Sequence, residues 1–284
     1  MSTTPEAAIN NDPETRFAFG KNWQRFLRYL SEERIAEAEK SLRVMLEVDS
    51  LAGKSFLDIG CGSGLFSLAA LRLGAGRVHS FDYDAQSVAC ALELRQRYFQ
   101  EADNWTVEQG SALDADYLAR LGPFDFVYSW GVLHHTGNMW QALEKVVAPV
   151  GVNGKLFIAL YNDQGLRSRL WRAVKQRYCR SVFWRVPIIA FFGSYILLAG
   201  LIKDLALLKN PLARFRDHQR SRGMSYFTDV LDWLGGYPFE VARAEAVMDF
   251  FQARGLELVK LVRPVKTTGN NEFVFLKPGQ TRSQ

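Results

Sequence analysis

A short apolar run that leads into three glycines at alternate positions constrains the fold more than any other feature of the chain. Residues 55–59 have the composition of a buried strand, and residues 64–73 follow with helical spacing. Glycines at such a junction let the backbone turn tightly and let a ligand approach the chain closely. The pattern predicts an α/β fold with a ligand site at the end of this strand. The loop residues of interest are Gly60, Cys61, Gly62 and Gly64.

The same alternation of strand and helix continues along the chain. Further strands are expected at 77–81, 105–109, 124–129 and 155–161, with helices at 85–99 and 138–147. A later helix, 243–254, precedes strands at 256–262 and 272–276, which are close enough in sequence to pair antiparallel. The pattern predicts an α/β, Rossmann-like, mostly parallel sheet with helices on both faces. One or two N-terminal helices are expected within 13–49.

Two carboxylates accompany the glycine loop. Asp58 stands just before the first glycine, and Asp82 ends the second strand. Position 65 is Leu, so the G-x-G-x-x-G pattern of dinucleotide-binding enzymes is absent. A carboxylate at position 58 would repel a pyrophosphate and attract an ammonium group, whereas one at position 82 can accept hydrogen bonds from both hydroxyls of a ribose. The alternative interpretation is that both carboxylates only cap helices.

These residues together resemble the first motif and the ribose-binding acid of the class I S-adenosylmethionine (SAM) methyltransferases. The resemblance covers residues 54–161 and 240–277 and implies a seven-stranded sheet whose last strand is inserted antiparallel. It implies SAM as the cofactor and methyl transfer as the activity. It also implies cofactor contacts from further positions. These are Tyr83, Ser111, Ala112 and Trp130, with Ser111 at a position where many relatives have Asp.

The ends of the fourth and fifth strands carry polar residues on the acceptor side of this arrangement. His134 and His135 follow the fourth strand, and Asp163 follows the fifth. Methyl transfer to a hydroxyl needs a base, and imidazole titrates near neutral pH. Either histidine is a candidate base, with His135 favoured and Asp163 as the carboxylate alternative. The segment around the two histidines is similar to that of small-molecule methyltransferases, the ubiquinone-pathway O-methyltransferases among them. No spacing typical of a metal site accompanies them, so no metal is expected.

A basic and apolar insertion interrupts the fold at residues 165–223. It holds 13 Lys and Arg against 2 Asp and Glu, a net charge of +11, whereas the rest of the chain carries −6. Within it, 186–202 is a 17-residue run without a charge. Because strands on both sides belong to one sheet, the chain must return to the side it left, which argues against a single membrane span. The interpretations left open are a segment in the interface of an anionic membrane, a lid or dimer face covered by protein, and a nucleic-acid surface.

The sequence therefore predicts four regions: an N-terminal helical cap at 1–53, a SAM-binding core at 54–164, the helical insertion at 165–223 and a completion of the core at 224–284. We expect a SAM-dependent methyltransferase that O-methylates a hydrophobic or lipid-linked small molecule at the cytoplasmic, inner face of a membrane. A soluble methyltransferase of a sugar, peptide or other polar metabolite, and a non-catalytic SAM-binding partner protein, are the alternatives. Nucleic acid is not the expected partner, and a homodimer stays open. Three cysteines without paired spacing suit a reducing compartment.

Overall fold

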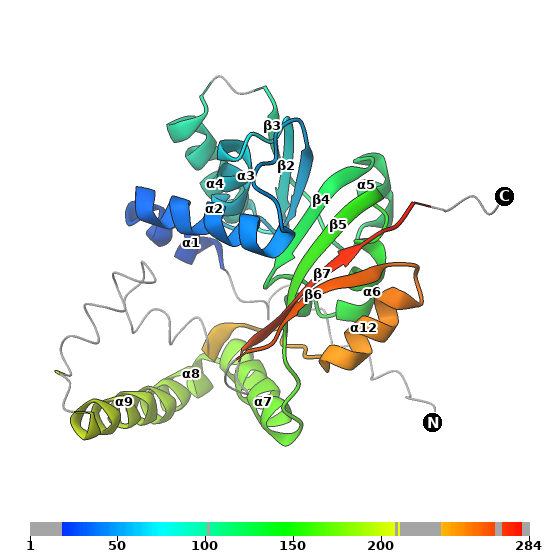
Figure 1. The fold of residues 1–284 in the computed structure, drawn as a ribbon. Coiled ribbons are helices and arrows are strands. Elements are labelled where there is room, and N and C mark those ends of the chain that lie inside the picture. Colours follow the sequence, from blue (N-terminus) through cyan, green and yellow to red (C-terminus); the bar gives the residue numbers. More distant parts are fainter. Residues whose placement is uncertain (1–18, 101–102, 208–209, 211–233, 265–268, 280–284) are drawn as a thin grey trace.

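The computed structural model describes residues 19–100, 103–207, 210, 234–264 and 269–279. Their centre is a seven-stranded sheet in the order β3-β2-β1-β4-β5-β7-β6 (Figure 1). Six strands run in the same direction, and β7 runs antiparallel to both of its neighbours, β5 and β6. The predicted seven-stranded, mostly parallel sheet and the antiparallel last strand are confirmed. The strands are β1 Ser55–Ile59, β2 Arg77–Asp82, β3 Trp105–Gln109, β4 Phe124–Trp130, β5 Val150–Tyr161, β6 Glu257–Val262 and β7 Asn270–Leu276.

Helices cover both faces of this sheet (Figure 1). One face packs on a core formed largely by α2, α3 and α4, and the other on a core formed by α5, α6 and α12. Both faces are therefore buried, as expected for parallel strands that read as continuous apolar runs. The helices of the core are α1 Gly20–Arg28, α2 Glu32–Leu46, α3 Leu65–Arg72, α4 Ala85–Tyr98, α5 Ala115–Arg120, α6 Met139–Lys145 and α12 Ala244–Gln252, with a short 3-10 helix η2 at Leu133–His135.

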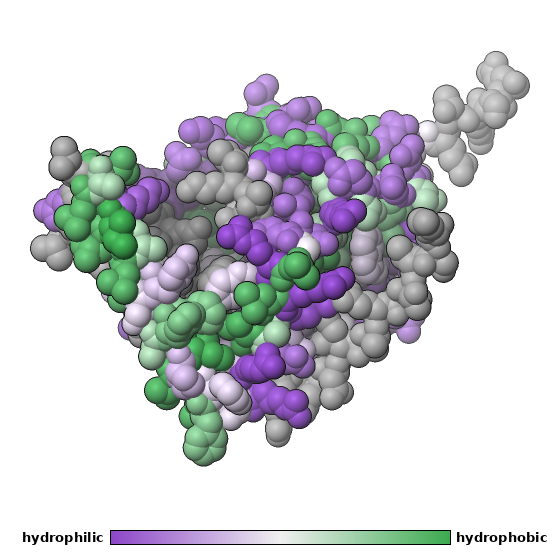
Figure 2. Space-filling model, turned by 90° about the horizontal axis from the view of Figure 1, so that it is seen from below, coloured by the Kyte–Doolittle hydropathy of each residue, from purple (hydrophilic) through white to green (hydrophobic). Residues whose placement is uncertain are grey.

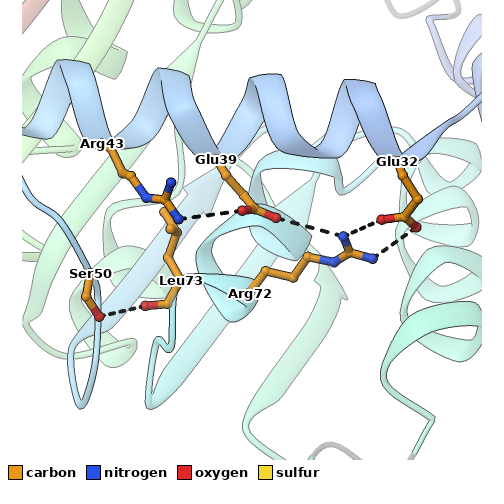
Figure 3. A network of polar contacts seen from close by, with 6 residues as sticks. All are labelled: Glu32, Glu39, Arg43, Ser50, Arg72 and Leu73. Carbon is orange, nitrogen blue, oxygen red and sulfur yellow. Dashed lines mark hydrogen bonds and ion pairs between the residues drawn. The ribbon is translucent and has the colours of Figure 1, made fainter.

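The N-terminal helices are fixed to the glycine-loop side of the sheet by charge as well as by packing. Figure 3 shows Arg72, at the end of α3, between two carboxylates of α2. Its guanidinium donates to both oxygens of Glu32, at 2.6 and 3.1 Å, and lies 3.9 Å from Glu39. Beside them, the Ser50 hydroxyl donates to the Leu73 carbonyl at 3.0 Å. These contacts hold α2 against α3, the helix that opens at the glycine loop.

The insertion is helical in the part that the structure describes. Helix α7, Leu166–Arg180, is followed by α8, Val182–Ile188, a π-helical turn η3, Ile189–Gly193, and α9, Ser194–Ala206. In Figure 1 the last three form one rod that projects from the domain. Residues 208–209 and 211–233, and with them the predicted boundary at 223, lie outside the described residues, as do residues 1–18 of the predicted cap.

Candidate active site

The glycine loop after β1 forms the floor of the site. Gly60 and Gly62 have left-handed backbones, with φ of 74° and 55°, so a side chain at either position would be strained. A Cβ at Gly62 would lie 2.8 Å from the indole ring of Trp23 in α1. The loop and Trp23 line the same cavity, and Cys61 is buried within the loop. Helix α1 thus lies directly over the loop, so close that a side chain at Gly62 would collide with Trp23.

Gly64 has a role in packing that was not predicted. It does not line the cavity, and a Cβ there would meet the Ala91 backbone of α4 at 3.0 Å. Its φ of 80° and this close approach show that it allows α3 and α4 to pack together. The cofactor contact predicted for Gly64 stays a prediction, and the structure adds a role for this glycine in helix packing.

Asp82 holds the loop in place from the end of β2. Its Oδ2 accepts a hydrogen bond from the Gly62 amide at 3.0 Å, and its Oδ1 accepts one from the Asp84 amide at 2.9 Å. Burial raises the pKa of this carboxyl to about 6. Each oxygen keeps a second lone pair, and the side chain lines the cavity. The position is compatible with the two hydroxyls of a ribose, and that role stays a prediction.

Asp58 lies deeper than Asp82 and is 2% exposed. Its Oδ2 accepts a hydrogen bond from the Ser67 hydroxyl of α3 at 2.5 Å, and Ser67 in turn contacts the Ser80 hydroxyl at 2.7 Å. Burial raises the pKa of Asp58 to about 7, since the Ser67 hydrogen bond offsets only part of the desolvation and Asp82 adds repulsion. The carboxyl still lines the cavity, where a cationic group would favour its ionised form. Ser67 was not found from the sequence, because a serine inside a helix carries no local signal of its partner.

The remaining predicted cofactor contacts surround the same space. Tyr83 and Trp130 are 55% and 45% exposed at its rim, and Ser111 and Ala112 line it from the loop after β3. The Ser111 hydroxyl accepts a hydrogen bond from the Leu113 amide at 3.1 Å, and so helps to shape that loop. Trp130 donates from Nε1 to Glu272 of β7 at 3.0 Å. All four positions are brought to the cavity.

The cavity measures about 1290 Å³ and extends past the carboxyl ends of β4 and β5 and the amino end of the antiparallel β7. Beyond the glycine loop its wall is mainly aromatic. The centroid of the Tyr161 ring lies 4.0 Å from that of His134 and 5.1 Å from that of Phe239. Trp171 of α7 contributes to the same wall. The volume exceeds what one drug-sized ligand needs, so a cofactor and an acceptor fit side by side. Tyr161 and Trp171 were not found from the sequence.

His135 points into this acceptor half of the cavity. Its Nδ1 lies 2.6 Å from the Pro238 carbonyl oxygen. A carbonyl only accepts, so Nδ1 carries the proton and Nε2 is the basic nitrogen. The Phe19 and Tyr161 rings pack against the imidazole, with ring centroids 5.2 and 5.5 Å from its centroid. The tautomer is compatible with a base, and the catalytic role of this residue stays a prediction.

His134 is held differently, 1% exposed and beside His135 at 4.4 Å between ring centroids. Both of its ring nitrogens are buried, and the Ala159 backbone lies beside the ring. Burial holds its pKa well below the ordinary value, and the charges of His135 and Lys175 add to this effect. A neutral imidazole in the cavity wall offers one donor and one acceptor to a ligand.

Two further polar groups of the wall were missed from the sequence. Asn270, at the start of β7, lines the cavity, and its buried Oδ1 has no partner among the described residues. It is the register partner of Tyr161. Asn162 accepts a hydrogen bond from Asn271 at 3.1 Å. Unpaired buried polar atoms are uncommon and often belong to ligand sites.

Asp163 is not brought to the cavity. Its Oδ1 accepts a hydrogen bond from the Gly165 amide at 2.8 Å, which shapes the turn that leads into α7. The prediction of Asp163 as an alternative base is therefore corrected, because the carboxylate caps a turn. Within the described ranges, no group of three or more His, Cys, Asp or Glu is placed to hold a metal ion.

The comparisons with known proteins agree with this fold. Residues 57–156 match the family described as "Methyltransferase domain". Among solved structures, magnesium protoporphyrin IX methyltransferase from Synechocystis with bound SAM has a TM-score of 0.55 at 12% identity over 96% of this chain and 99% of that one. The N-methyltransferase NodS from Bradyrhizobium japonicum has 0.50 at 15% identity over 93% and 100%. The chain therefore contains a methyltransferase domain over residues 57–156, and the solved structures share its overall fold.

Two kinds of curated relative share part of the sequence. A tRNA U34 carboxymethyltransferase from Methylococcus capsulatus is 30% identical over 65% of this chain and 55% of its own length. A ribosomal protein L11 methyltransferase from Xanthomonas campestris is 34% identical over 36% of this chain and 30% of its own length. The chain spans about half the length of the tRNA-modifying relatives it matches. These relatives lend no support to the prediction that nucleic acid is not the partner.

The residues present fit SAM. The side-chain-free loop at Gly60 and Gly62 can receive the close approach of a ligand, Asp82 keeps acceptor capacity for a ribose, and Asp58 offers a buried carboxylate to an ammonium group. Ser111, Ala112 and Trp130 line the remaining side of the same cavity.

Proposed function

We propose that the protein transfers the methyl group of SAM to a hydroxyl oxygen of a hydrophobic or lipid-linked molecule at the cytoplasmic face of a membrane. The observation that carries this proposal is the continuous cavity. It extends from the glycine loop and Asp82 to an aromatic chamber in which His135 presents Nε2 as its basic nitrogen. Donor and acceptor would lie in one space, as in-line transfer requires.

SAM, when bound, supplies an electrophilic methyl group on a sulfonium sulfur. The residues of this chain orient the two reactants and handle the proton. Asp82 and Asp58 hold the donor by its hydroxyls and its ammonium group. His135 takes the hydroxyl proton at Nε2 as the oxygen–carbon bond forms and the carbon–sulfur bond breaks, and its Nδ1–H stays on the Pro238 carbonyl. The base then returns its proton to solvent.

The aromatic wall supports an apolar acceptor. Tyr161, Phe239 and Trp171 provide large, weakly hydrated surfaces beside the histidines. The basic insertion next to this wall supports a position at a membrane. Helix α7 contains six Lys and Arg and no Asp or Glu, and each such residue near an anionic leaflet contributes about 1 kcal/mol.

The test is the formation of S-adenosylhomocysteine from SAM with a cell lipid extract, compared with a water-soluble extract from the same cells. We expect turnover with the lipid extract only, and at least tenfold less of it for an Asp82→Ala variant at a SAM concentration below saturation. Turnover confined to the water-soluble extract would replace the hydrophobic acceptor by a polar metabolite. SAM binding without turnover on either extract would indicate a non-catalytic partner protein.

A second candidate is the modification of RNA. It is favoured by the basic α7 beside the cavity and by relatives named for action on tRNA. The same assay with total tRNA separates the two. Methyl incorporation into tRNA at a rate above that with the lipid extract would favour the second candidate.

A further inference from the structure

The rod, Val182–Ala206, is one continuous helical segment of 25 residues with a mean hydropathy of 1.9 in its most apolar stretch. Only 12% of that stretch is buried. A helix of this composition in a soluble core would be mostly covered. The sequence left open that residues 186–202 are buried on their own domain, but Phe191 is 68% exposed and Leu197 is 45% exposed. The apolar surface of the rod therefore requires a partner outside the described part of the chain.

Much of this apolar surface follows one side of the rod, and Leu197 and Leu201 extend it toward the other side. Exposed residues recur every three, four or five positions along the whole rod. They are Phe183, Val186, Phe191, Tyr195, Leu198, Ile202 and Leu205, and we call them the outer stripe. The five-residue step from Val186 to Phe191 spans the π-helical turn, in which hydrogen bonding runs from i to i+5 and keeps both residues on one side. At 1.5 Å per residue the stripe is about 33 Å long.

Four positions of the rod are buried and follow a complementary pattern. Ile188, Gly193, Gly200 and Asp204 are buried, and their spacing of five, seven and four residues follows the same periodicity across the same turn. The rod therefore carries its four buried positions opposite the outer stripe, with the exposed Leu197 and Leu201 beside them. A helix inserted end-on into a bilayer would carry these buried positions and the charged residues near its far end into lipid. The buried Asp204 and the exposed Lys203, near the far end, also oppose a deep end-on insertion.

The basic residues around the outer stripe indicate what kind of partner it binds. Arg185 and Lys203 are exposed near the two ends of the rod. Helix α7, which directly precedes the rod, adds four exposed arginines, Arg167, Arg169, Arg177 and Arg180. An apolar stripe with cationic residues at its ends and beside it is the composition of a segment that lies in the interface of an anionic membrane. In Figure 2, hydrophobic atoms gather at the left of the molecule, where Figure 1 places α9.

The π-helical turn of the rod contacts a residue of the cavity wall. Phe192 of the π-helical turn contacts Trp171 with ring centroids 4.9 Å apart, and Trp171 lines the cavity. Phe191, on the outer stripe, contacts Phe192 at 5.0 Å. A row of three aromatic rings therefore leads from the outer stripe to the acceptor chamber.

We propose that the outer stripe lies flat in the interface of an anionic membrane, and that Phe191, Phe192 and Trp171 form the wall along which an apolar acceptor passes from the bilayer into the cavity. The second clause rests on the proposed function, whereas the first does not. Membrane docking and acceptor transfer are accordingly measured separately.

Docking is tested on the full chain with vesicles of phosphatidylglycerol and phosphatidylcholine and no acceptor. The protein should sediment with them, less with pure phosphatidylcholine. Leu198→Glu together with Ile202→Glu should weaken sedimentation at least tenfold, because two carboxylates enter the stripe. Val152→Glu is the matched control, since Val152 is 70% exposed and lies at the start of β5, outside the insertion. Equal sedimentation of the double variant and the control would overturn the docking.

Orientation is tested with an environment-sensitive dye on Phe183→Cys, Leu198→Cys or Leu205→Cys, with dye-treated native protein as the background. Nitroxide lipids labelled near the headgroup should quench all three dyes to a similar extent, and more than lipids labelled near the chain end. A progressive change in depth from position 183 to position 205 would mean end-on insertion, and would overturn the flat arrangement. Absence of quenching with dimer formation in solution would assign the stripe to a second copy of the chain.

Acceptor transfer is tested with the lipid extract, either incorporated into the vesicles or dissolved in detergent. Trp171→Ala should lower kcat/KM on vesicles at least tenfold and change it less in detergent, with unchanged SAM affinity. Trp140→Ala is the control, because Trp140 is a half-exposed tryptophan of α6 outside the cavity. Equal losses in both formats would make Trp171 a cavity residue only and overturn the transfer route. No turnover by the native protein in either format would reject the proposed function and leave the docking result standing.

Discussion

The substitution Asp58→Asn separates the effect of the buried carboxyl on protein stability from its effect on SAM binding. Asp58 is 2% exposed, and burial raises its pKa to about 7. The pKa of an aspartate in an unfolded chain is about 3.9, and the difference corresponds to on the order of 2–4 kcal/mol. The folded protein binds this proton more tightly than the unfolded chain. Its free energy of unfolding should therefore fall as the pH rises from about 4 to about 7, and the whole penalty is present above that range.

Asparagine removes this penalty and keeps the shape of the side chain, and its Oδ1 can still accept the Ser67 hydrogen bond. At pH 8 the variant without SAM should be more stable than the native protein by on the order of 2–4 kcal/mol, and at pH 4 the two should be similar. SAM affinity should fall about 10- to 150-fold, because an ammonium group loses a charged partner. Urea unfolding at several pH values and calorimetric titration with SAM measure the two effects.

Asp125→Asn is the matched control. Burial alone would raise the pKa of Asp125, but hydrogen bonds from the Ser55 amide and hydroxyl and the nearby Lys54 outweigh it and hold the pKa below its ordinary value. The sign is opposite, so this variant should lose stability at neutral pH and keep its SAM affinity. The reasoning is refuted if Asp58→Asn is destabilised at pH 8, or if it retains the pH dependence of the native protein.

Four other substitutions test the site. Asp82→Ala should weaken SAM binding by about 1.5–3 kcal/mol, measured by calorimetry, because the loop amide of Gly62 also loses its acceptor. Gly62→Val should abolish SAM binding in the same assay, since its φ is 55° and its Cβ would lie 2.8 Å from the Trp23 ring. His135→Ala should lower kcat about 10²- to 10⁴-fold with SAM affinity unchanged. Asn270→Ala should raise the KM for the acceptor about tenfold and leave kcat close to native, because its buried Oδ1 is available to a donor group of the acceptor.

The cofactor half of the site could be predicted because its signals are local in sequence. The loop from Asp58 to Gly62 belongs to one strand-to-loop junction, and Asp82 ends the next strand along the chain. A parallel sheet brings such strand ends together by its topology alone. The separate roles of the third glycine and of Asp58 were not predicted. The third glycine packs helices, and Asp58 is partly occupied by Ser67, which depends on how closely α3 lies on the sheet.

The acceptor half depends on contacts between distant parts of the chain. The partner of His135 is the carbonyl of Pro238, 103 residues away, and Asn270 reaches the cavity only because β7 pairs antiparallel with β5. No spacing in the sequence encodes either contact. Asp163 was misassigned for the same reason: its place after a strand was visible, but the turn to Gly165 that occupies its carboxylate was not.

The insertion shows how the two halves are connected. It begins directly after β5, the strand that ends at Tyr161 in the acceptor wall, and its first helix contributes Trp171 to that wall. Trp171 in turn contacts Phe192 of the π-helical turn. A displacement of the rod would therefore shift the acceptor wall, whereas the glycine loop and Asp82 lie on other strands. This arrangement lets the surface that receives the acceptor vary without disturbing the elements that hold the donor.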